Sequence, residues 1–138
     1  MIAAALCIVV GTALVSVPAQ RFTLRWQHTV EKVLWEEDYV VAGEWLYLSG
    51  ARVQGSGAGM EPPPDAVRVG TAWHYRPANR WHRAVNLARS AIGRDYELCV
   101  DGVCRPMSAW IPGAPAATTL SPCPGSAAPA RQDPRQDR

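Results

Sequence analysis

The stretch FTLRWQHTV, residues 22–30, alternates strictly between two kinds of side chain and decides the fold class. Phe22, Leu24, Trp26 and His28 fall on one face, and the residues between them are polar. A period of two residues over nine positions is typical of a half-buried β-strand. The core is therefore expected to be built from β-sheets.

Shorter apolar stretches follow this strand at close spacing, separated by Gly, Pro and polar residues. They predict strands over residues 39–41, 45–53, 66–69, 71–75, 84–88, 96–100 and 103–107. No segment has a convincing amphipathic helical period, although residues 81–90 are ambiguous. About seven or eight short antiparallel strands indicate an all-β domain, either a small sandwich or a barrel.

The sequence CVDGVC, residues 99–104, predicts a hairpin. An Asp-Gly pair in a two-residue loop favours a type I′ turn, because both central residues need a positive φ. This turn pairs Val100 with Val103 and places Cys99 opposite Cys104, within reach of a disulfide. A zinc site is the alternative, but C-x₄-C has no second ligand pair at a suitable spacing. We expect a disulfide in an oxidising compartment.

The N-terminal residues predict export. Residues 2–17 carry no charge, and small residues at 17–19 suit cleavage after Ala19. Residues 1–19 are therefore interpreted as a signal peptide or, if uncleaved, as an N-terminal anchor that contacts the membrane through residues 2–17. The folded domain is expected over residues 20–107, in the periplasm or another extracytoplasmic compartment.

Residues 108–138 are rich in Pro, Ala, Gly, Ser and Thr. Such a composition buries little apolar surface, so these residues are interpreted as a disordered tail. Cys123 would then be an unpaired or intermolecular thiol, while Trp110 could fold back onto the domain.

Charge excludes one class of partner. The chain has 14 basic and 12 acidic residues, a formal net charge of +2, and no block of like charge. This balance lacks the basic surface that nucleic-acid binding requires.

His28 is the first candidate for a functional side chain, because it interrupts an apolar strand face between Trp26 and Val30. It is either a structural histidine that bonds to the backbone or a carboxylate, or a ligand contact near the end of the strand. Glu31 points to the opposite face of a straight strand, so a shared site with His28 needs a bend after Val30.

Two further segments have a functional and a structural interpretation. The acidic run Glu36-Glu37-Asp38 could supply oxygen ligands to a cation, but it lacks the spacing of a calcium loop and is interpreted as a solvated turn. The glycine-rich residues 55–59 are followed by Glu61-Pro62-Pro63-Pro64, which prevents the helix of a phosphate-binding loop. They are expected to form a loop that lets a small ligand or another backbone approach closely.

Six short motifs occur in order within residues 22–106: HTVE (28–31), WEE (35–37), GSGAGME (55–61), WHYRP (73–77), LARS (87–90) and LC (98–99). This combination resembles a bacterial family of small extracytoplasmic proteins of unknown function, often encoded beside TRAP transporter components of the TAXI type. The family pattern usually has serine at the position of Thr29. The resemblance implies a domain that works near a solute-uptake system, and it assigns no catalytic residue.

We therefore expect a non-enzymatic accessory or binding module of a TRAP-type uptake system. Its expected partners are a small carboxylated solute or a membrane or solute-binding subunit of the transporter. An alternative is a metal-binding protein or metal-dependent hydrolase centred on His28 and nearby acids, and a third is a structural envelope domain. No cofactor or resident metal is assigned. The expected contact residues are His28, Thr29, Glu31, Glu36, Gly55, Ser56, Gly57 and Gly59.

Overall fold

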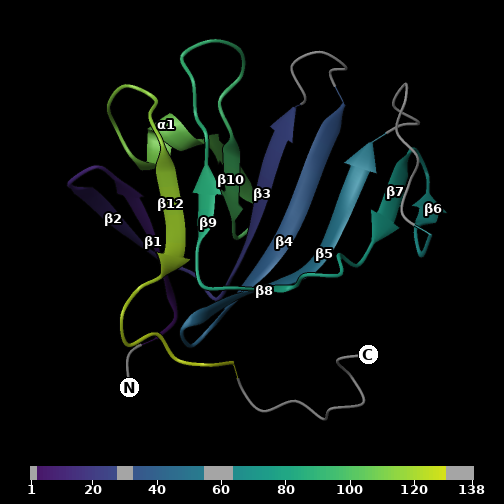
Figure 1. Ribbon diagram of the computed structural model, residues 1–138, viewed down its shortest axis with the longest axis horizontal. Helices are drawn as coiled ribbons and strands as arrows, with labels where there is room; N and C mark the ends of the chain where they lie inside the picture. Colours follow the sequence, from purple (N-terminus) through teal and green to yellow (C-terminus); the bar gives the residue numbers. More distant parts are fainter. Residues whose placement is uncertain (1–2, 28–32, 55–63, 130–138) are drawn as a thin grey trace.

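The chain folds as two antiparallel β-sheets in a computed structural model that describes residues 3–27, 33–54 and 64–129. One sheet has four strands in the order β2-β1-β12-β9; the other has eight, in the order β11-β10-β3-β4-β5-β7-β6, with β8 also paired to β5. The all-β sandwich that the sequence predicts is confirmed (Figure 1). The strands of the small sheet are β1 (Ala5–Val10), β2 (Ala13–Pro18), β9 (Val85–Leu87) and β12 (Thr118–Pro122). Those of the large sheet are β3 (Arg21–Gln27), β4 (Leu34–Ala42), β5 (Trp45–Gln54), β6 (Val67–Val69), β7 (Ala72–Tyr75), β8 (Trp81–His82), β10 (Glu97–Val100) and β11 (Val103–Pro106), and a short helix α1 (Met107–Trp110) follows β11.

Strand β3 has the two faces that its alternating sequence predicts. Phe22 and Leu24 are buried, whereas Thr23 and Arg25 lie on the opposite face of the sheet. The strand ends at Gln27, so the expected continuation through residue 30 lies outside the described residues. The face that carries Phe22 and Leu24 is called the inner face below, and the other the outer face.

The core lies between the small sheet and one end of the large sheet. Leu6, Ile8 and Leu120 from the small sheet pack with Leu24 and Leu98 from the inner face, and all five side chains are almost fully buried. In Figure 1 the small sheet stands beside β10 and β3, while β7 and β6 lie at the far end of the large sheet. Strand β5 still contributes Leu46 and Leu48 to the core that the two sheets share.

The structure places residues 5–18, part of the segment that the sequence predicts to be a signal peptide or anchor, in the small sheet. Strands β1 and β2 make a hairpin in which Gly11 adopts a φ of 57°, and Leu6 and Ile8 are completely buried in the core. Uncharged residues rich in Val, Ile and Ala suit a buried hairpin as well as an apolar helix, and hydropathy alone does not separate the two. Within the described part of the chain, no helix is long and apolar enough to cross a bilayer.

The segment that the sequence predicts to be a disordered tail from residue 108 also contains a strand of the small sheet. Strand β12 lies between β1 and β9 at the centre of the small sheet, and Leu120 is fully buried. Cys123 is not an unpaired thiol but forms a disulfide with Cys7, 116 residues away. The strand was missed because its partners come from distant segments, which local composition does not reveal. Residues 130–138 lie outside the described ranges.

The Asp-Gly hairpin is confirmed in detail. Asp101 and Gly102 adopt positive φ values of 53° and 77°, and Cys99 pairs with Cys104 in the register β10 to β11. The two cysteines form the predicted disulfide. Trp110 does fold back, since its indole Nε1 donates to the carbonyl oxygen of Leu98 at 3.0 Å.

The two disulfides should differ in their contribution to stability. Replacing Cys7 and Cys123 together by alanine removes a link across 116 residues and should lower the free energy of unfolding by about 4 to 5 kcal/mol, whereas the same change at Cys99 and Cys104 should cost about 2 kcal/mol. Urea unfolding under non-reducing conditions measures both values. Equal losses in the two double variants would contradict this assignment.

Candidate functional site

Most of the predicted contact residues fall outside the part of the chain that the structure describes. These are His28, Thr29, Glu31, Gly55, Ser56, Gly57 and Gly59. The described residues that flank them are informative, because Gln27 is paired with Leu34 and Trp35 is paired with Val53. The end of β3, the start of β4 and the end of β5 therefore lie at the same end of the large sheet.

The acidic run is not a solvated turn. Glu36, Glu37 and Asp38 lie within β4, a central strand paired on one side with β3 and on the other with β5. Alternation along the strand places Glu36 and Asp38 on the outer face and Glu37 on the inner face. The run was misinterpreted because Glu36 and Asp38 find their partners on the neighbouring strands β3 and β5.

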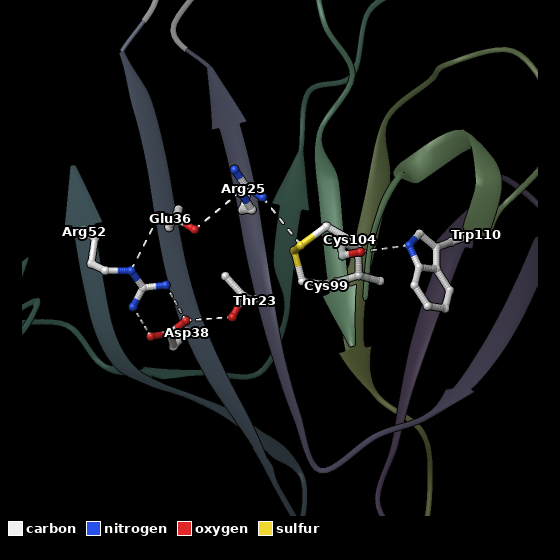
Figure 2. Close-up of a disulfide and its surroundings, with 9 residues drawn as sticks. Thr23, Arg25, Glu36, Asp38, Arg52, Cys99, Cys104 and Trp110 are labelled. Carbon is white, nitrogen blue, oxygen red and sulfur yellow. Dashed lines mark hydrogen bonds and ion pairs between the residues drawn. A yellow bond between two sulfur atoms is a disulfide. The ribbon is translucent and has the colours of Figure 1, made fainter. Parts of the chain in front are cut away.

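On the outer face, two arginines neutralise two of these acids (Figure 2). Glu36 lies 3.4 Å from Arg25 Nε and 3.6 Å from Arg52 Nε. The guanidinium of Arg52 also binds both oxygens of Asp38, and the hydroxyl of Thr23 donates to Asp38 Oδ1 at 2.7 Å. Burial opposes ionisation of Asp38, but the bonds from Arg52 and Thr23 outweigh it and hold its pKa below the usual value.

This arrangement changes the role expected for Glu36. Its carboxylate is held between Arg25 and Arg52 and is only 17% exposed. Such cross-strand ion pairs stabilise the sheet, which is a more direct role for Glu36 than binding an exogenous ligand. Among the described residues, no group of three or more His, Cys, Asp or Glu side chains lies close enough to hold a metal ion.

Glu37 lies in a different environment, on the inner face beside three tyrosines. The hydroxyl of Tyr39 donates to its Oε1 at 2.9 Å. Burial raises the pKa of Glu37 above its usual value, although the Tyr39 hydrogen bond and the nearby His82 partly offset this effect. Burial and the charge of Glu37 in turn raise the pKa of Tyr75 and Tyr96.

A cavity of about 240 Å³ opens where β3 ends. One wall is aromatic, since the rings of Trp26 and Tyr96 contact each other with centroids 6.0 Å apart. The opposite wall is the segment from Ala88 to Asp95, between β9 and β10. Gln27 lines the cavity and directly precedes His28 in the sequence.

An internal ion pair fixes the shape of this cavity. Arg89, whose side chain is 1% exposed, binds both oxygens of Asp95 at 2.9 Å and donates to Thr118 Oγ1 at 3.1 Å. The same carboxylate accepts backbone N–H bonds from Tyr96 and Ser108. These bonds hold the pKa of Asp95 below its usual value against the effect of burial. The wall is therefore tied to β12 and to α1.

Arg94 is the functional candidate that the sequence did not single out. It lines the cavity, is exposed, and has no ion-pair partner among the described residues. Arg89 is five residues earlier but is fully engaged by Asp95. No local pattern distinguishes these two arginines, because only the tertiary structure shows which of them has a carboxylate.

The opposite pKa shifts of Glu37 and Asp38 predict opposite pH dependences. The pKa of Glu37 is higher in the folded protein than in the unfolded chain. As the pH rises from the unfolded pKa to the folded pKa, the unfolded chain releases this proton first, and the folded state therefore loses stability. Glu37→Gln should therefore stabilise the protein more at pH 7 than at pH 4. Urea unfolding of both proteins across this range measures the difference.

Asp38→Asn is the matched comparison on the adjacent residue. Because the pKa of Asp38 is lowered, its contribution is complete above the unfolded pKa and is lost as the pH falls through the folded pKa. This variant should be less stable than the parent at pH 7, and the difference should shrink in acid. A gain in stability for Asp38→Asn at pH 7 would refute the role of the Arg52 pair.

Comparison with known proteins identifies a family but no characterised relative. Residues 22–107 match the model of a domain of unknown function, DUF1850, and this range covers most of the chain, from the second residue of β3 to the first residue of α1. No curated protein and no solved structure matches the chain. The chain thus belongs to the DUF1850 family.

Proposed function

We propose that this protein is a non-enzymatic, extracytoplasmic binding module that takes a small carboxylated solute in the cavity between β3 and the segment before β10. The observation that carries the proposal is that Arg94, which has no ion-pair partner among the described residues, lines one concave site together with the aromatic side chains of Trp26 and Tyr96. Ligand sites of small molecules typically combine apolar walls with a few polar groups that fix orientation.

The charge and size of the cavity favour this class of ligand. An arginine fork binds a carboxylate through two parallel hydrogen bonds. A volume of about 240 Å³ is below the range of about 300–1,000 Å³ that accommodates drug-sized ligands. A small organic acid with a short carbon skeleton fits both conditions, with its apolar part against Trp26.

The extracytoplasmic location is supported by the two disulfides. All four cysteines of the chain are paired, Cys7 with Cys123 and Cys99 with Cys104. Disulfides persist in oxidising compartments and are rare in reducing ones. The family resemblance carried by the motifs in residues 22–106 implies a role as an accessory module of a TRAP-type uptake system, and the cavity would serve such a role by retaining a transported acid.

Binding should depend on Arg94. Thermal shift and calorimetry with small mono- and dicarboxylates should detect a ligand of the intact protein, and Arg94→Gln should weaken its affinity by about tenfold or more, the scale of one charged hydrogen bond. Arg83→Gln is the matched control, because Arg83 is also an exposed arginine but contacts Glu44 and Trp45 instead. Equal affinities for parent and Arg94→Gln would reject this site.

The transporter association requires its own measurement. Full-length tagged protein, purified from detergent-solubilised membranes of its natural host, should retain the TRAP membrane or solute-binding subunit as identified by mass spectrometry. Tagged protein with Trp26→Ala tests whether the cavity is involved. Absence of every TRAP subunit from the purified material would reject the association and leave the ligand site to be judged by calorimetry.

A further inference from the structure

The Cys99–Cys104 bridge should contribute less to stability than the Cys7–Cys123 bridge, and other interactions also hold its hairpin. It closes a separation of only five residues, and the Asp-Gly turn sets the same register independently. Strand β10 is also paired with β3, and Trp110 Nε1 donates to the carbonyl of Leu98. The Cys7–Cys123 bridge, by contrast, links the two ends of the chain. Opening the hairpin bridge should therefore leave the sandwich folded.

The same bridge is accessible from solution on one side. Strand β11 is an edge strand of the large sheet, and all four of its residues, Cys104 among them, are exposed. Cys99, on the adjacent strand, is only 8% exposed. An incoming thiolate can therefore reach the sulfur of Cys104 more easily than that of Cys99.

A positive charge stands beside the exposed sulfur. Arg25 Nη1 lies 3.6 Å from Cys104 Sγ, as Figure 2 shows. Arg25 Nε is buried and makes no hydrogen bond within the described residues, although it lies 3.4 Å from Glu36. The guanidinium thus extends from β3 over β10 toward the disulfide. An adjacent arginine stabilises a cysteine thiolate.

We propose that Cys99–Cys104 is a thiol–disulfide exchange site that accepts two electrons from an extracytoplasmic dithiol. The proposal rests on the hairpin, its exposed sulfur and Arg25, so it is independent of the ligand cavity. Exposed disulfides that carry little structural load belong to the labile class that reacts reversibly.

The exchange proceeds in two balanced steps. A thiolate of the external dithiol attacks Cys104 Sγ, the bond between the two cysteine sulfurs breaks, and Cys99 leaves as a thiolate that takes up a proton. The second thiolate of the reductant then attacks the reductant's sulfur in the mixed disulfide, and Cys104 leaves as a thiolate beside Arg25 and takes up the second proton that the dithiol released. The external dithiol is oxidised to a disulfide, and the protein disulfide is reduced to two thiols.

Arg25 assists at Cys104 in both steps. Its charge attracts the incoming thiolate in the first step and stabilises the departing Cys104 thiolate in the second. Glu36 opposes this effect, because its negative charge forms an ion pair with the guanidinium of Arg25. The rate of exchange should therefore fall when Arg25 loses its charge and rise when Glu36 loses its charge.

The experiment follows each disulfide separately in the full chain. Dithiothreitol is added at graded concentrations, thiols are trapped by alkylation, and mass spectrometry reports the state of each cysteine pair while tryptophan fluorescence reports folding. We expect Cys99–Cys104 to open first, with Cys7–Cys123 intact and the protein folded. Simultaneous opening of both bridges, or unfolding as the hairpin bridge opens, would overturn the proposal.

Charge variants test the role of Arg25. Arg25→Gln should slow reduction of the hairpin bridge about fivefold, the scale of one exposed charge pair, and Glu36→Gln should accelerate it. Arg105→Gln is the matched control, because Arg105 adjoins Cys104 in sequence but lies over the ring of Trp110. Equal rates in Arg25→Gln and Arg105→Gln would overturn the proposal. If Arg25→Gln does not fold, Glu36→Gln decides, and an unchanged or slower rate counts against it.

Discussion

The pairing of β1 with β12, locked by the Cys7–Cys123 disulfide, is the constraint on which the rest of the structure depends. It joins the two ends of the chain into the small sheet, and that sheet supplies Leu6, Ile8 and Leu120 to the core. Without this cover, the inner face of β3 and β10 would expose a row of apolar side chains to water. A domain of this size has little buried surface to spare, so closing the largest loop of the chain has a large effect on stability.

Strand β4 organises the chemistry of the molecule, because it sorts three consecutive acids onto two faces. Glu36 and Asp38 join an ion-pair row with Arg25 and Arg52 on the outer face, while Glu37 meets Tyr39 on the inner face. The same period of two residues that makes β3 amphipathic therefore gives adjacent carboxylates opposite pKa shifts. The outer row stabilises the sheet and also sets the charge beside the hairpin disulfide.

The two candidate sites lie on opposite sides of β3. The cavity uses Trp26 on the inner face, whereas the disulfide contact uses Arg25 on the outer face. Consecutive residues of one strand therefore line the cavity and contact the disulfide. Because the two sites share no side chain, loss of solute binding and loss of exchange are separable by mutation. A solute-binding module whose exposed disulfide also responds to a dithiol would couple its state to the redox condition of its compartment.

The sequence by itself determined the features that depend on near neighbours: the alternation of β3, the all-β class and the Asp-Gly hairpin with its disulfide. These are local, because a period of two residues and a positive φ are encoded within a few positions. Tertiary structure alone decided that β1 pairs with β12, that Cys123 meets Cys7, that Glu36 is held by arginines and that Arg94 lines one cavity with Trp26. Each of these depends on a partner far away in the chain, and hydropathy and composition carry no information about which distant segment that partner occupies.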